Sequence, residues 1–101
     1  MAQLNFTDRV VPLGQAGLAR QLTAGSTTSN TALTAGVFRI SMRAVGADIR
    51  FSIGTGTQTA TTSSHFIANG ERLDFAIPGA ANIAVLRNGT TDGTLEVTEL
   101  S

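Results

Sequence analysis

Apolar and polar residues alternate along much of the chain from Val37 onward. A repeat of two residues is the period of a strand with one buried face, and a helix has a different period. We therefore expect strands in residues 37–45, 48–53, 71–78 and 94–100, and a central strand, apolar on both faces, in residues 82–87. The predicted inward side chains are Phe38, Ile40, Met42, Ala44, Ile49, Phe51, Ile53, Leu73, Phe75, Ile77, Leu95 and Val97.

Short turn signals separate these alternating stretches. Asn-Gly and Asp-Gly pairs supply the positive φ angles of tight turns, and strands at this spacing indicate a sandwich or a barrel. Weaker strand candidates near residues 10–13, 29–33 and 65–68 bring the number to about eight, as in a jelly roll. We expect an all-β fold, a single antiparallel β-sandwich of jelly-roll type, in residues 23–101. The turn pairs are Val45-Gly46, Asn69-Gly70, Pro78-Gly79, Asn88-Gly89 and Asp92-Gly93.

The first 22 residues do not follow this alternation. Residues 13–22, LGQAGLARQL, form either a short helix or an arm that orders against a partner. Residues 5–13, NFTDRVVPL, have no clear place in the core, and Pro12 suits an edge strand. Residues 1–22 are therefore either an N-terminal arm that adds a strand to a partner's sheet, or a first strand with a short linker. The contact candidates on this segment are Phe6, Val10, Val11 and Leu13.

Composition narrows the functional classes. The 101 residues suffice for one domain. Seven scattered arginines balance seven carboxylates, so we expect no nucleic-acid partner, because binding to a phosphate backbone needs clustered cations. Cysteine is absent, which excludes disulfides and thiol chemistry. The N-terminus lacks a signal-peptide pattern and no apolar run approaches the ~20 residues of a membrane span, so we expect a protein made in the cytoplasm without a membrane partner.

Residues 53–66, IGTGTQTATTSSHF, raise the question of a phosphate-binding loop. Gly54 and Gly56 have the first spacing of such a loop, but the third glycine is missing and the chain has no lysine. The residues that follow are rich in threonine and favour strands over the helix that a phosphate loop needs. We therefore expect a long, solvated connection that offers a contact surface. Its exposed candidates are Thr55, Thr57, Gln58 and Thr59.

No catalytic set is visible. His65 is the only histidine, so neither a triad nor a histidine-based metal site can be completed with a second imidazole. The carboxylates at Asp48, Asp74, Glu96 and Glu99 are expected on solvent-facing strand positions, paired with Arg43, Arg50 or Arg72 across strands. The absence of tryptophan and tyrosine weakens a sugar-binding interpretation. We expect a protein that is not an enzyme and that uses no cofactor or metal.

The stretch from Arg39 to Leu100 resembles small virion proteins of tailed bacteriophages. The likeness lies in ADIRFSIG with its Thr/Ser loop, in HFIANGERLDFAIP and in the closing DGTLEVTEL. The resemblance implies a β-sandwich module that decorates or cements the head, commonly as a homotrimer. It implies a place on the capsid surface, with the major capsid protein and further copies of the chain as partners. The alternative is a tail- or fibre-associated module that binds a receptor or a carbohydrate.

Overall fold

A computed structural model describes residues 15–100 of the chain, and these residues form eight strands and no helix. The described part of the chain therefore holds no helix that is long and apolar enough to span a bilayer. Seven of the eight expected strands are confirmed, and most of their ends lie within one or two residues of the expected positions. The candidate at residues 10–13 lies outside the described residues. The strands are β1 (Ala16–Ala24), β2 (Ser29–Ala32), β3 (Arg39–Val45), β4 (Ile49–Thr55), β5 (His65–Ile67), β6 (Arg72–Ala76), β7 (Ala81–Arg87) and β8 (Gly93–Leu100).

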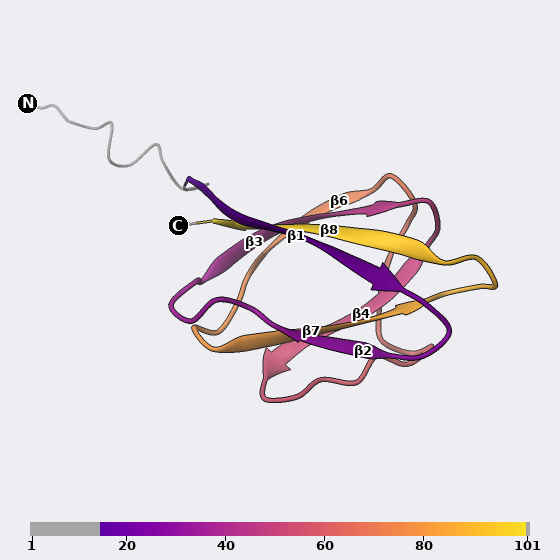
Figure 1. Ribbon diagram of the computed structural model, residues 1–101, viewed down its shortest axis with the longest axis horizontal. Coiled ribbons are helices and arrows are strands. Elements are labelled where there is room, and N and C mark those ends of the chain that lie inside the picture. The colour runs from indigo at the N-terminus through magenta and orange to yellow at the C-terminus, as the bar shows by residue number, and fades with distance from the viewer. Residues whose placement is uncertain (1–14, 101) are drawn as a thin grey trace, which may run out of the picture.

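The strands form two four-stranded antiparallel sheets that face each other (Figure 1). Sheet A has the order β1-β8-β3-β6 and sheet B has the order β2-β7-β4-β5. In chain order, β1 pairs with β8, β2 with β7, β3 with β6 and β4 with β5, so the chain is one long hairpin rolled up into two layers. This nested pairing is the topology of a jelly roll. The all-β sandwich predicted from the alternation is confirmed.

The core lies between the two sheets and uses the inward face of each strand. Ile40, Met42 and Ala44 on β3 are fully buried. On β8, Leu95 and Val97 are at most 1% exposed. On β7, Ala81, Ile83 and Val85 are buried on the inner face, and Ala84 is buried on the outer face as well. The prediction of a central strand with two apolar faces is therefore confirmed, since β7 lies between β2 and β4.

Two of the predicted inward phenylalanines are exposed. Phe38 is 60% exposed because it precedes β3, and its ring lies against Gly79 instead of the core. Phe75 is 39% exposed although it contacts Phe51, because β6 is an edge strand and β5 is only three residues long. Of the phenylalanines in residues 15–100, only Phe51 is fully buried.

Residues 16–24 form β1, so the short helix considered for this region is wrong. β1 pairs with β8 from Ala16 to Ala24, with an irregularity between Ala16 and Ala19. Small residues at the exposed edge of a sheet leave little periodic signal, which explains why the sequence pattern was weak here. The expected boundary between residues 22 and 23 falls inside this strand.

Strand ends and connecting loops are distributed differently over the two ends of the sandwich. Ala16 pairs with Leu100, and Leu100 also pairs with Arg39, which is opposite Ala76. The start of β1, the end of β8 and the end of β6 therefore share one end, at the left of Figure 1. The loops that join β3 to β4 and β7 to β8 lie at the other end.

Candidate functional site

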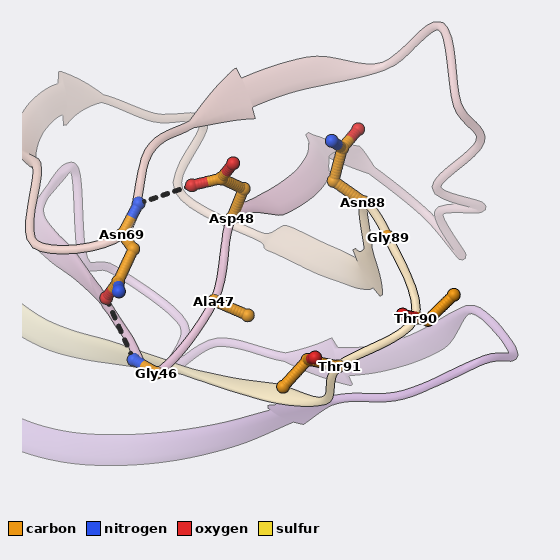
Figure 2. Close-up of a pocket in the computed structure, with 8 residues that line it drawn as sticks. All are labelled: Gly46, Ala47, Asp48, Asn69, Asn88, Gly89, Thr90 and Thr91. Atoms are coloured by element: carbon orange, nitrogen blue, oxygen red, sulfur yellow. Dashed lines mark hydrogen bonds between the residues drawn. The ribbon is translucent and has the colours of Figure 1, made fainter.

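A polar cleft occupies the end of the sandwich that lies away from the chain ends (Figure 2). It has a volume of about 330 Å³ and is formed by three loops, β3–β4, β5–β6 and β7–β8. Asp48 and Asn69 lie on one side of the cleft and the β7–β8 loop lies on the other. The lining residues are Gly46, Ala47, Asp48, Asn69, Asn88, Gly89, Thr90 and Thr91.

Hydrogen bonds between the loops fix the shape of this cleft. The Asn69 amide donates to Asp48 Oδ1 at 2.8 Å, and Asn69 Oδ1 accepts from the Gly46 amide at 2.9 Å. Gly46 has a φ of +93°, a left-handed conformation that favours glycine. The Asn88 amide donates to the Asp48 carbonyl at 3.1 Å, which joins the third loop to the first. The cleft is therefore held in place by the protein itself.

The cleft offers hydrogen bonds but no catalytic set. Asp48 is its only carboxylate, and His65 does not line it. Within residues 15–100, no group of three or more metal-ligating side chains could hold a metal ion. An Asp oxygen and Thr hydroxyls suit the hydroxyls of a neutral polar ligand. No aromatic ring lines the cleft to provide the flat face on which a sugar stacks.

The Thr/Ser loop between β4 and β5 lies across the outer face of sheet B. The Gln58 amide donates to Asn30 Oδ1 and the Ala60 amide donates to Thr28 Oγ1, both at 2.8 Å. These bonds hold the loop across the outer face of sheet B, from β4 over β7 to β2. They explain why Ala60 and the outward-facing Ala84 are buried. We call residues 56–64 the strap. The long, solvent-exposed connection expected from the sequence is therefore confirmed for most of its residues, but it is anchored on sheet B at Gln58 and Ala60.

The four predicted loop residues take different positions on the strap or at its start. Thr55, Thr57 and Thr59 are exposed, whereas Gln58 is half-buried. The Gln58 side-chain amide lies over β4, where Ser52 Oγ donates to Gln58 Oε1 at 2.8 Å. A Cβ at Gly54 would come within 2.8 Å of Gln58 Nε2, so Gly54 leaves room for this side chain. Gln58 therefore fixes the strap, Thr57 and Thr59 face solvent from it, and Thr55 faces solvent from the end of β4.

Arg50 connects the strap to the cleft, a role that the sequence did not reveal. Its Nε donates to Asn88 Oδ1 at 2.8 Å, and its Nη1 donates to the Ser64 carbonyl at 3.1 Å. Its guanidinium also lies 4.8 Å from the centre of the Phe66 ring, which covers part of that ring. The only sequence signal was its outward position between Ile49 and Phe51, which does not name a partner.

The expected pairing of carboxylates with Arg43, Arg50 and Arg72 is not found. In the described residues the ion pairs are Arg20–Glu99 at 3.1 Å and Arg87–Asp92 at 2.7 Å. The prediction that Glu99 faces solvent is wrong, since its side chain is only 3% exposed. Glu99 belongs to the same face of β8 as Leu95 and Val97 and is buried near the last residue of this strand.

The buried Glu99 carboxylate is compensated by two residues, Arg20 and Thr34. Glu99 Oε2 accepts hydrogen bonds from Arg20 Nε at 3.1 Å and from the Thr34 amide at 3.0 Å. Burial alone would raise the pKa of Glu99, but hydrogen bonds from Thr34 and Arg20 and the charge of Arg20 outweigh it and lower the pKa. The carboxylate therefore joins β1 to the loop between β2 and β3.

The side of the sandwich at β5 and β6 is open and apolar. β5 pairs only with Ile49, Arg50 and Phe51 of β4, so the end of β4 has no strand on that side among the described residues. A hollow of about 190 Å³ lies there between the sheets. Phe38 and Phe75 add exposed rings close to the same end of β6. We call this region the open side; its hollow is lined by Phe51, Ile53, His65, Phe75, Ala76 and Pro78.

The predicted contact residues Phe6, Val10, Val11 and Leu13 lie outside the described residues. No protein-family model matches the chain, and no curated protein or solved structure matches it either. Function is therefore inferred from the fold and from the surfaces described above.

Proposed function

We propose that the protein is a non-enzymatic structural protein of a tailed-bacteriophage virion, a decoration (cement) protein that binds and stabilises the head. Its partners would be the major capsid protein and further copies of the chain, which the resemblance implies form a trimer. It would be made in the host cytoplasm and reside on the capsid surface. The jelly-roll topology supports the proposal by analogy, because viral capsid domains commonly have this fold.

The observation that carries the proposal is the open side. It presents exposed phenylalanine rings, an apolar hollow and an edge strand with free backbone groups on one side of a 101-residue protein. Contiguous apolar surface beside an unpaired strand is typical of protein–protein contact. The strap and the polar cleft, in contrast, satisfy many of their own hydrogen bonds within the protein.

The test uses heads assembled from the major capsid protein of the virus that encodes the chain. We expect the purified protein to co-sediment with these heads and to raise their resistance to heat and to low salt. Phe38→Ser on the open side should weaken binding, because it removes the most exposed phenylalanine ring of residues 15–100. Val45→Ser is the matched control, since Val45 is 38% exposed at the other end of β3. Heads that neither bind nor gain stability would contradict the proposal.

The second candidate is a receptor- or carbohydrate-binding module of a tail or fibre. The polar cleft favours it, because it collects a carboxylate, amides and hydroxyls in one hollow. A glycan array separates the two functions. Reproducible binding that Thr91→Val abolishes, together with unchanged head stability, would favour the second candidate over the first.

A further inference from the structure

β6 is one of the two edge strands that sheet A has among residues 15–100, the other being β1, and the unpaired backbone groups of β6 can be assigned. The Ile77 amide donates to the Phe38 carbonyl, and the Glu71 carbonyl accepts from the Ala44 amide. Odd-numbered residues of β6 therefore direct their backbone groups toward β3, because backbone groups alternate in direction along a strand. The amides and carbonyls of Arg72, Asp74 and Ala76 consequently face away from the sheet, on a side where the described part of the chain adds no further strand.

The outer face of this edge carries two opposite charges two residues apart. Arg72 and Asp74 are both exposed, and neither takes part in an ion pair among residues 15–100. Arg72 lies opposite Arg43 on β3, a like-charge neighbour, and Arg43 lies opposite Glu96 on β8. The row of opposed side chains across sheet A therefore runs from the negative Glu96 through the positive Arg43 to the positive Arg72. At the β6 edge, Arg72 has no negative neighbour in this row among the described residues.

We propose that β6 pairs with β6 of a second copy in an antiparallel register centred on Leu73. In this register Arg72 of each copy lies opposite Asp74 of the other, and these are the residues whose backbone groups face outward. Each such pair exchanges two backbone hydrogen bonds, which gives four across the two-fold axis. The two sheets become one continuous eight-stranded sheet, and Asp74 of the second copy completes the charge row.

Charge selects this register over the alternatives. A register centred on Asp74 uses the same backbone groups but places two aspartates opposite each other, which is unfavourable. One centred on Phe75 places Asp74 opposite Ala76 and leaves Arg72 unpaired. An edge protected against self-pairing would carry charges of one sign or a proline, whereas Arg72-Leu73-Asp74 is complementary to itself in an antiparallel pair.

The contact rests on the proposed function in naming how two copies meet, and because a two-fold contact closes at two copies it gives a dimer in place of the trimer that the resemblance implies. It is tested on the purified protein without capsids. Either proposal can then fail alone. We expect the wild-type protein to show a concentration-dependent dimer in analytical ultracentrifugation. Asp74→Arg and Arg72→Asp should each raise the dimer dissociation constant by about tenfold or more, since each replaces two attractive pairs with two repulsive ones.

Mixing the two variants gives the decisive result. An equimolar mixture of Asp74→Arg and Arg72→Asp places opposite charges at both positions of a heterodimer, so association should return in the mixture. The double variant with both charges exchanged should also dimerise. Glu96→Arg is the control, because it makes the same charge reversal on the same face, two strands from the edge. A mixture that stays monomeric, or a trimer that ignores all these changes, would overturn the proposal.

A cross-link tests the register independently. The chain has no cysteine, so Leu73→Cys introduces a single thiol at the centre of the proposed pairing. Cα atoms of a directly opposed non-hydrogen-bonded pair lie at a distance that a disulfide spans. We expect Leu73→Cys to form a disulfide-linked dimer under mild oxidation, and Gln21→Cys on the β1 edge to remain monomeric. Circular dichroism verifies that each variant is folded, and a folded Leu73→Cys protein that does not cross-link would contradict the register.

Discussion

At the scale of single residues, Glu99 is the most demanding group in the interior. A carboxylate that is 3% exposed loses its hydration and is stable only with close hydrogen-bond donors. Arg20 and Thr34 supply these donors from two segments that are far from Glu99 in sequence. The interaction therefore holds the edge strand β1 against the rest of the sandwich, at the end where β1 starts and β8 ends.

Glu99→Gln tests this interaction. The amide keeps the shape of the side chain but removes the negative charge and leaves Arg20 without a counter-charge. We expect the free energy of unfolding at pH 7 to fall by about 1 to 3 kcal/mol, measured by urea denaturation. Glu96→Gln, on the exposed face of the same strand, should change it by less than about 0.5 kcal/mol. Equal effects of the two substitutions would contradict the importance of burial.

The lowered pKa of Glu99 gives this effect a pH dependence of known sign. Because the folded-state pKa lies below the unfolded value, Glu99 contributes stability above the unfolded pKa of about 4.3. That contribution is lost as the pH falls through the folded pKa. We expect the stability difference between the wild-type protein and Glu99→Gln to shrink on acidification from pH 5 to pH 2, measured by thermal unfolding. A difference that stays constant with pH would show that charge is not involved.

The inward position of Glu99 was present in the sequence pattern, although its charge argued against it. Glu99 follows Leu95 and Val97 at the two-residue period that predicted the buried face of this strand. The partner was not predictable, since Arg20 is 79 positions away and its strand has almost no alternation. Local periodicity predicts which way a side chain points, but not what it meets in a non-local fold.

At the scale of elements, the strap covers sheet B in the place where a second layer is needed. The outward-facing Ala84 on β7 gave a signal for this cover, because a strand that is apolar on both faces must be covered on both. The identity of the cover could not be predicted, since hydroxyl-rich residues favour solvent as readily as a sheet surface. Hydrogen bonds to Thr28 and Asn30 hold the strap on the sheet surface.

Thr28→Val tests the attachment of the strap. Valine preserves the shape of threonine and removes the hydroxyl that accepts from the Ala60 amide. We expect hydrogen exchange at the Ala60 amide to accelerate by about tenfold, with a change of less than about 1 kcal/mol in global stability. Thr59→Val alters an exposed threonine of the same strap and should leave this exchange unchanged. Fast exchange in the wild-type protein would contradict the anchored strap.

Arg50→Lys tests the link between strap and cleft. Lysine keeps the charge but cannot reproduce the planar fork that reaches Asn88 and Ser64 together. We expect a loss of about 1 kcal/mol in the free energy of unfolding and faster proteolytic cleavage within residues 56–64. Arg39→Lys, on the outer face of sheet A, is the control and should leave both measurements near the wild-type values.

At the scale of the whole molecule, nested pairing makes most contacts non-local. The innermost hairpin, β4–β5, is closed by the strap, and the outermost pair joins residues close to the two chain ends. Such topologies fold slowly, because long loops must close before their contacts form. We expect refolding in milliseconds to seconds, followed by stopped-flow circular dichroism, since the chain has neither tryptophan nor tyrosine. Refolding in microseconds would be inconsistent with this topology.

The start of β1 and the end of β8 lie side by side, while the polar cleft lies at the far end of the same sandwich. This separation has a practical consequence for presenting a foreign peptide. A peptide inserted between Gly89 and Thr90 would project from the end opposite the start of β1 and the end of β8. A fusion partner attached before β1 or after β8 would therefore not block access to the peptide. The protein is thus suited to present an inserted peptide away from a surface to which it is attached before β1 or after β8.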